Sequence, residues 1–354
     1  MTPVYAYFLP QFYSIPENDK YWGKGFTEWT NVRNSKPRFK GHRNPILPVN
    51  EDYYDLSEPD TVKRVLTNSR DIGIDAVAYW YYWFGDGKKA LTKVPEQHLK
   101  DKTIEQDFFF AWANNNWSKE WVGDRSQVIF EQKYNLHEID EHLDSLMKYF
   151  EDDRYVKWNG QPLLQLNEAH KSQGYEYIFE LNNRFVQRTG TSIKWIFPSV
   201  FVGQKLRSLS HFISGYPTED FLKIDWASTI RRKLARWGLG KKPVVIEKDH
   251  FLKMFRKVLK KNQKEEDYIP CLLSGWDNTY RYKDRGYIIS GTIEELVKEQ
   301  MNIVREEIDL KKLPFILVKS YNEWAEGNIM ENHMLKKEKV DISHLVNDVI
   351  KKKN

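Results

Sequence analysis

Two glutamates three residues apart near the end of the chain, Glu323 and Glu326, are the residue types that glycosidic-bond chemistry needs. Such chemistry takes one carboxyl group that manages protons and a second that assists at or near the sugar ring. An apolar run, Phe315 to Val318, precedes the pair, and Asn322 and Trp324 flank the first glutamate. Glu-x-x-Glu is also common where solvated helices begin. The strand-like run, the amide and the tryptophan favour a catalytic pair.

The elements that must position this pair recur along the chain as short apolar runs that end in polar or aromatic residues. Strand-like runs cover residues 4–10, 74–84, 108–113, 162–166, 195–200, 269–275 and 315–318, and either 211–217 or 243–247 supplies one more. Helical patterns cover residues 59–73, 138–150, 174–188, 249–262 and 293–310. This alternation in 354 residues predicts the α/β class and a single TIM-type (β/α)8 barrel. An open doubly wound sheet is the alternative, but no Gly-x-Gly-x-x-Gly turn follows the first strand.

The active site of such a barrel lies at the C-terminal ends of its strands. We therefore expect substrate contacts from residues that follow the strand-like runs. Aromatic faces can stack on sugar rings, and amides and carboxylates can bond to hydroxyl groups. Each candidate also has a plain structural interpretation, as core, turn or salt bridge. The candidate contacts are Glu28, Trp29, Tyr81, Trp83, Asn114, Asn116, Trp117, Glu168, Trp276, Asp277, Asn278, Asn322 and Trp324.

Other chemistries have weaker support in the sequence. The nine histidines form no His-Glu-x-x-His motif, and the spacing of His137 and His142 does not place both on one helix face. A P-loop and a Gly-x-Ser-x-Gly elbow are also missing. We therefore expect neither a metal site nor a serine triad.

The overall charge gives little reason to propose a nucleic-acid partner, because 55 basic residues oppose 50 acidic ones for a net charge of +5. Basic residues concentrate at 231–242, 253–264 and 351–353. They allow weak contact with an anionic membrane surface, although solvated helix faces and a frayed end explain them as well. One cysteine, Cys271, excludes an intrachain disulfide. Without a leader or a long apolar stretch, we expect a soluble cytoplasmic protein. It would be one domain, 1–354, with a short basic tail at about 335–354.

Six blocks of the sequence resemble the signature blocks of the WbsX-like proteins. That family is related to glycoside hydrolase family 99 and is often labelled a glycosyltransferase of polysaccharide biosynthesis. The blocks extend from residue 5 to about 327, so the resemblance covers nearly the whole chain. They are Tyr7–Phe12, Ile15–Asp19, Trp22–Val32, Trp112–Asn114 with Asn116–Trp117, Gly275–Thr279 and Asn322–Gly327.

The resemblance implies a (β/α)8 barrel, a glutamate pair and no metal or organic cofactor. Family 99 hydrolases are retaining, endo-acting α-mannosidases. By analogy, Glu323 would act as a base on the sugar 2-hydroxyl, which closes a 1,2-anhydro sugar. Glu326 would protonate the leaving oxygen and later activate water. This chain departs from the family pattern at Asn115, where a glutamate is usual, at Tyr13 and Tyr81, where histidines are common, and in the segment Asn167-Glu168-Ala169. We expect these positions to line the pocket and to alter sugar specificity.

Three functions remain open from the sequence. The first is a retaining glycoside hydrolase that acts on an α-linked glycan. The second is a glycosyltransferase or transglycosylase that builds a surface polysaccharide such as O-antigen or capsule, although missing nucleotide-binding signatures argue against a sugar-nucleotide donor. The third is a catalytically silent sugar-binding protein, which the intact pair Glu323 and Glu326 disfavours.

Overall fold

The central sheet of the computed structural model is a path of parallel strands in the order β13-β11-β10-β9-β5-β3-β1-β16-β14. The structure describes residues 1–118, 128–167, 172–198, 208–215, 230, 234, 242–262 and 267–352. The strands of the path are β1 (Val4–Phe8), β3 (Ala76–Gly85), β5 (Asp107–Trp112), β9 (Gln161–Leu166), β10 (Lys194–Pro198), β11 (Ser210–Ser214), β13 (Tyr268–Ile269), β14 (Cys271–Leu273) and β16 (Ile316–Lys319).

The two ends of this path, β13 and β14, are separated in sequence only by Pro270. Proline interrupts a strand because it has no N–H group for the ladder. The run nevertheless bonds on both sides: Ile269 O accepts from Gly215 N at 2.8 Å, and Pro270 O accepts from Leu317 N at 3.0 Å. The nine strands of the path therefore close as a ring of eight, since β13 and β14 are one interrupted strand. The predicted (β/α)8 barrel is confirmed.

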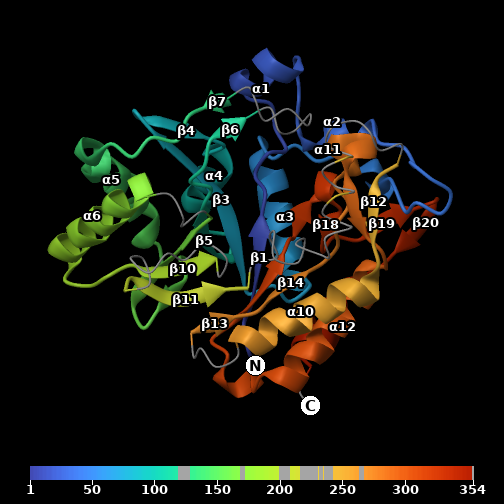
Figure 1. Ribbon diagram of the computed structural model, residues 1–354. Coiled ribbons are helices and arrows are strands. Elements are labelled where there is room, and N and C mark those ends of the chain that lie inside the picture. Colours follow the sequence, from blue (N-terminus) through green and yellow to red (C-terminus); the bar gives the residue numbers. More distant parts are fainter. Residues whose placement is uncertain are drawn as a thin grey trace.

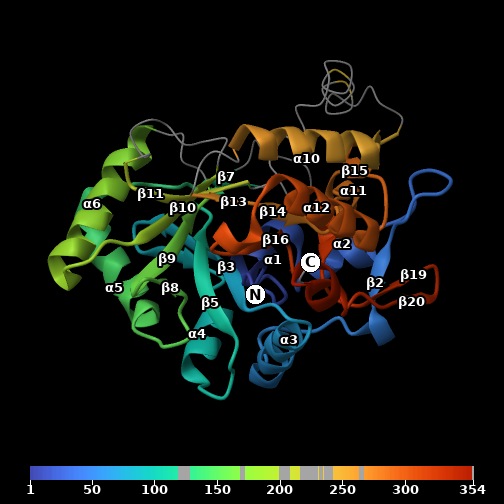
Figure 2. The same cartoon turned by 90° about the horizontal axis from the view of Figure 1, so that it is seen from below.

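Helices surround this ring, as the view from below shows (Figure 2). Helix α12 illustrates why they form: its buried residues recur at helical spacing, and a capping box of Thr292 and Glu295 starts it. The outer helices are α3 (Pro59–Asp71), α4 (Lys93–Lys100), α5 (Ile139–Phe150), α6 (Ser172–Thr189), α10 (Lys248–Asn262) and α12 (Ile293–Glu307). The five predicted helices all occur, within a few residues of their expected bounds.

The two candidate segments for one further strand have different outcomes. Residues 211–214 of the first segment belong to β11 in the barrel, and residues 216 and 217 lie outside the described residues. Residues 244–246 of the second segment form β12 (Val244–Ile246), which pairs outside the ring with β15 (Tyr287–Ile289). Regular elements also occur in the described part, 335–352, of the segment predicted as a short basic tail. Strands β19 (His333–Leu335) and β20 (Glu338–Val340) form a sheet with β2 (Ile46–Pro48), and the π-helix η7 (Leu345–Ile350) buries three aliphatic side chains.

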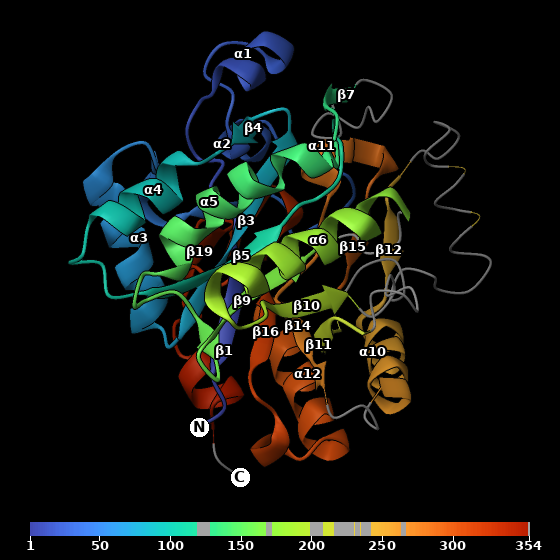
Figure 3. The same ribbon diagram turned by 90° about the vertical axis from the view of Figure 1, so that its left-hand side faces the viewer.

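Several of the shorter elements lie above the C-terminal ends of the barrel strands, at the top of Figure 1, whereas both chain termini lie at the bottom (Figures 1 and 3). Within the described ranges, no helix combines the length and apolar character that crossing a membrane requires. The shorter elements are α1 (Pro16–Trp22), α2 (Glu28–Arg33), α11 (Thr279–Tyr282), β4 (Lys88–Ala90), β6 (Trp117–Ser118), β7 (Val128–Phe130), β8 (Lys157–Trp158), β17 (Asn322–Glu323), β18 (Asn328–Ile329), and the 3-10 turns η1 (Val49–Glu51), η3 (Leu136–Glu138), η4 (Lys283–Arg285), η5 (Leu310–Lys312) and η6 (Trp324–Glu326).

Candidate active site

A cavity of about 180 Å³ opens at the C-terminal end of the barrel and contains both predicted carboxylates, Glu323 and Glu326. Residues from six different strand ends or following loops meet in it, as expected for the functional face of such a barrel. It is lined by Leu9, Trp80, Tyr82, Phe84, Ala113, Asn115, Asn116, Trp117, Ser118, Asn167, Arg281, Lys319, Glu323 and Glu326.

Glu323 is held from three directions. Trp80 Nε1 donates to its Oε1 at 2.6 Å, and Lys319 Nζ donates to its Oε2. Its backbone N–H donates to Ser320 Oγ at 3.0 Å. The side chain is only 5% exposed. Burial raises the pKa of Glu323 to about 7, against the attraction of Lys319 and with the repulsion of Glu326.

Glu326 faces two cations instead of one. Arg281 Nη1 donates to its Oε1 at 2.5 Å, and Lys319 Nζ donates to its Oε2 at 3.1 Å. Burial alone would raise the pKa of Glu326, but Lys319 and Arg281 outweigh it and hold the pKa at about 2. The carboxyl groups of Glu323 and Glu326 contact the same nitrogen, Lys319 Nζ. One of the pair is therefore poised to carry a proton while the other stays ionised.

Glu28 lies beneath the cavity and is fully buried. Its carboxylate accepts from Arg281 Nη2 at 3.1 Å and from Ala325 N at 2.8 Å. Burial raises the pKa of Glu28, and the charge of Arg281 opposes that shift. The prediction of Glu28 as a sugar contact is corrected: it orients Arg281 and anchors the turn that carries Glu326.

The aromatic residues of β3 divide between two faces, because successive side chains of a strand point in opposite directions. Trp80 and Tyr82 line the cavity. Tyr81 and Trp83 point outward and stack on His142 of α5, with ring centroids 5.7 and 4.3 Å apart. The prediction that Tyr81 and Trp83 contact substrate therefore selected the wrong face. Tyr13 also lies outside the cavity lining, whereas Asn115 and, from the departing segment 167–169, Asn167 line the cavity.

Three of the predicted sugar contacts do not line the cavity and make contacts within the protein instead: Trp29, Trp324 and Asn322. The rings of Trp29 and Trp324 pack 5.3 Å apart, and both are buried. Trp324 Nε1 donates to Glu331 Oε2 at 2.7 Å. Asn322 accepts from Leu9 N at 2.7 Å and donates to Leu9 O at 3.0 Å, which ties the loop after β16 to the end of β1.

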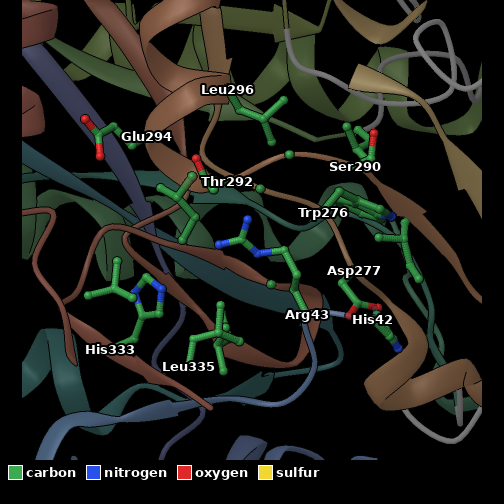
Figure 4. Close-up of a pocket in the computed structure, with 18 of the residues that line it drawn as sticks. His42, Arg43, Trp276, Asp277, Ser290, Thr292, Glu294, Leu296, His333 and Leu335 are labelled. Atoms are coloured by element: carbon green, nitrogen blue, oxygen red, sulfur yellow. Dashed lines mark hydrogen bonds and ion pairs between the residues drawn. The ribbon is translucent and has the colours of Figure 1, made fainter. Parts of the chain in front are cut away.

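Trp276, Asp277 and Asn278 do not line the carboxylate cavity either. Trp276 and Asp277 border a second cavity of about 240 Å³, into which Arg43 reaches (Figure 4). Asp277 Oδ2 accepts from Asn44 Nδ2 at 2.8 Å and lies 2.9 Å from His42 Nε2. Asn278 Oδ1 accepts from Tyr287 N at 2.8 Å. These contacts fix the loop after β14.

The asparagine-rich segment after β5 has mixed outcomes. Asn116 and Trp117 line the cavity as predicted. Asn114 is buried and bonds to Tyr134, with its Nδ2 donating to the phenol oxygen at 3.0 Å. Glu168, the remaining candidate, lies outside the described residues. Within the described ranges, no three His, Cys, Asp or Glu side chains gather closely enough to hold a metal ion.

Sequence reasoning missed several cavity residues. For Lys319, the available signal was an ionisable side chain at the end of an apolar strand, four residues before Glu323. For Trp80 and Tyr82, the signal was membership of the same aromatic run as Tyr81. Arg281 sits in an ordinary basic turn, and nothing in its local sequence distinguishes it.

The fold has counterparts among solved structures. A glycoside hydrolase-like protein superposes with a TM-score of 0.64 at 12% identity, covering 99% of this chain and 94% of its own. A GH99 endo-alpha-mannosidase from Bacteroides thetaiotaomicron superposes with a TM-score of 0.56, at the same identity and coverage. At 12% identity these likenesses establish the fold alone.

Comparison of sequences gives the family. A protein of Xanthomonas campestris pv. campestris, described as uncharacterized protein WxcX, is 35% identical over 165 residues. That match spans 47% of this chain but 24% of the relative, so the chain covers about a quarter of the relative's length. The family model described as Glycosyltransferase WbsX matches residues 4–340. The chain therefore belongs to the family described as Glycosyltransferase WbsX.

Proposed function

We propose that the protein cleaves α-glycosidic bonds of an oligosaccharide or polysaccharide with retention of configuration, using Glu323 and Glu326. The observation that carries this proposal is the contact of both carboxyl groups with one nitrogen, Lys319 Nζ. Inverting glycosidases separate their carboxyl groups by roughly 6.5–9.5 Å to make room for a water molecule. Two carboxyl groups held by the same ammonium nitrogen lie closer together than that, so their separation favours retention.

Below about pH 7 the pair holds one proton, and this proton rests on Glu323. The roles proposed for the pair need it on Glu326, so it must first pass between the two carboxyl groups. In the proposed mechanism, Glu323 removes the proton of the 2-hydroxyl group and the resulting oxygen attacks the anomeric carbon. Glu326 gives a proton to the departing glycosidic oxygen, and a 1,2-anhydro sugar results. Water then opens this ring while the two protons return. The roles follow the resemblance to family 99, and the close pair supports an exchange of protons within the site.

The pH dependence of activity follows from the shifts of the pair. Between about pH 2 and about pH 7 the pair holds one proton, because Glu326 is ionised and Glu323 is not. We expect kcat/KM to fall as pH rises through about 7, since Glu323 then loses the proton. Initial rates from pH 4 to 9 measure this limb. A rate that climbs steadily to pH 9 contradicts the shared proton.

A hydrolysis assay tests the proposal. The protein is incubated with α-mannan fragments and other α-linked polysaccharides, and proton NMR identifies the anomer released first. Retention gives the α-anomer before mutarotation, whereas a β-anomer released first contradicts the proposed chemistry.

Transfer to another sugar is the second candidate, and the description of the family as a glycosyltransferase favours it. Adding a glycan acceptor to the same incubation distinguishes the two. Extension of the acceptor with no free reducing end indicates transfer, and calorimetry with sugar nucleotides shows whether the donor is a nucleotide.

Trp117 is expected to serve as a sugar platform. Its ring stacks on Tyr82 with centroids 5.2 Å apart, and both side chains line the cavity. An aromatic contact of this kind is worth roughly 1–1.5 kcal/mol, which corresponds to about a tenfold change in affinity. We therefore expect Trp117→Ala to raise KM about tenfold with a smaller change in kcat. Trp117→Phe keeps a ring and should recover most of the affinity; equal KM in all three proteins excludes the platform.

A further inference from the structure

The second cavity, of about 240 Å³, takes no part in the proposed chemistry, and its lining differs from that of the carboxylate cavity. Much of the lining is hydrocarbon, contributed by strands β2, β12, β15, β19 and β20 and by the first turn of α12. Its aliphatic side chains include Ile46, Val245, Ile289, Leu296, Leu335 and Val340. Val245 is 39% exposed, so this apolar surface extends to the solvent. Contact with a hydrocarbon chain would remove the surface from water, which is favourable.

Arg43 brings a positive charge to this cavity, since its side chain reaches in among the lining residues and stays exposed (Figure 4). Among the described residues, no carboxylate forms an ion pair with Arg43. Of the glutamates that begin α12, Glu294 lies 3.8 Å from His344 Nε2. Glu295 instead accepts from Thr292 N at 2.7 Å, within the capping box. The guanidinium group of Arg43 is therefore open to an anionic ligand.

The loop after β14 forms a wall between the second cavity and the carboxylate cavity. Trp276 and Asp277 of this loop line the second cavity. Asp277 N donates to Glu326 O at 2.7 Å. The centroid of the Trp276 ring lies 5.6 Å from Lys319 Nζ. Because Glu326 and Lys319 line the carboxylate cavity, a ligand in the second cavity would contact the other side of this wall. The indole of Trp276 should therefore report the arrival of such a ligand.

We propose that the second cavity binds an amphiphile with one hydrocarbon chain and an anionic head group, with the chain on the aliphatic lining and the head on Arg43. The planar guanidinium group matches the paired oxygens of a phosphate or carboxylate head. A neutral sugar would set its hydroxyl groups against aliphatic side chains, which costs free energy. Free phosphate would leave the apolar surface in water. Neither Glu323 nor Glu326 takes part, so this binding stands or falls separately from the proposed function.

Calorimetry on the full chain with four probes tests the proposal. Octyl phosphate and octanoate carry both a chain and an anionic head, octanol carries the chain alone, and inorganic phosphate carries the head alone. We expect saturable binding of at least one anionic amphiphile, with octanol bound about tenfold more weakly and inorganic phosphate more weakly still. The tighter of the two anionic probes distinguishes a phosphate head from a carboxylate head. No saturable binding of either one overturns the proposal, and so does equal affinity for octanol or for inorganic phosphate.

Nitrogen-15 NMR of protein labelled at tryptophan locates the bound probe. Trp276→Phe assigns the indole signal of Trp276. We expect this signal to move as the tighter anionic probe is added to the wild type, and to saturate at the calorimetric Kd. A bound probe that leaves the signal in place occupies another site and overturns the proposal. Because the titration uses wild-type protein, it remains decisive if a variant fails to fold.

Arg43→Met removes the charge and keeps a chain of similar length. It should weaken binding of the tighter anionic probe about tenfold and leave binding of octanol unchanged. Arg33→Met is the matched control, because Arg33 packs over the ring of Tyr53, 4.0 Å from its centroid, outside the cavity lining. Val245→Gln should weaken binding of the anionic probe and of octanol alike. Equal affinity for the anionic probe in Arg43→Met and in the wild type contradicts the proposal.

Discussion

Glu326→Gln is expected to lower kcat by about 10²- to 10⁴-fold, the usual contribution of a positioned acid or base. The amide keeps the size of the side chain, and its single oxygen can still accept from one of the two cations, Arg281 or Lys319, but it cannot give a proton to a leaving oxygen. KM should change much less, since the rest of the cavity is intact. Steady-state rates on whichever α-linked glycan the hydrolysis screen identifies measure the effect.

Glu331→Gln provides the matched control. Glu331 is five residues further along, is half-buried, and accepts from Trp324 and Tyr54 outside the cavity lining. Its variant should retain most of the wild-type rate. Equal loss in both variants would indicate a general disturbance of this turn, and full activity in Glu326→Gln would end its assignment as an acid.

Arg281→Met is expected to destabilise the fold by roughly 3–5 kcal/mol, the cost of removing one partner from a buried charge pair. Arg281 is nearly buried and bridges two carboxylates, Glu28 at 3.1 Å and Glu326 at 2.5 Å. Without it, both lose their shared cation in a site from which water is largely excluded. Urea unfolding followed by tryptophan fluorescence measures the change.

The compensating variant is Glu28→Gln. In the Arg281→Met background it removes a buried charge that has lost its partner, while the amide oxygen can still accept from Ala325 N. We expect the double variant to recover part of the lost stability. Losses that simply add would show that Arg281 and Glu28 do not interact energetically.

The barrel could be predicted well from the sequence because each of its strands can be recognised from its own residues. Buried parallel strands are continuous apolar runs, and helices between them keep their own spacing. The same continuous apolar character made it impossible to predict which side chains of β3 face the cavity. In the run from Ala76 to Phe84 nearly every residue is apolar or aromatic, so no alternation marks which side chains face inward. Tyr81 and Trp83 were therefore chosen where Trp80 and Tyr82 line the cavity.

Ion-pair partners were harder to predict, because they meet only after the ring closes. Arg281 and Glu28 are 253 residues apart, and Glu28 lies next to a buried tryptophan that resembles a sugar platform in sequence. Asn322 and Asp277 were predicted as sugar contacts because amides and carboxylates suit hydroxyl groups. In the structure, the backbone of Leu9 and the side chain of Asn44 use those same bonding groups.

The hydrogen bonds between Asn322 and Leu9 have a consequence for folding during translation. They join residues 313 positions apart, and β1 has β16 as a neighbour, so the first and last barrel strands meet beside the cavity. A ribosome-bound chain that lacks the final strand can form neither those bonds nor the glutamate pair. Early strands can pair with one another as they emerge from the ribosome. The outer edges of that partial sheet stay unpaired until the late strands have been made. The cavity with its two carboxylates should thus remain incomplete in the nascent protein until the final barrel strand has been translated.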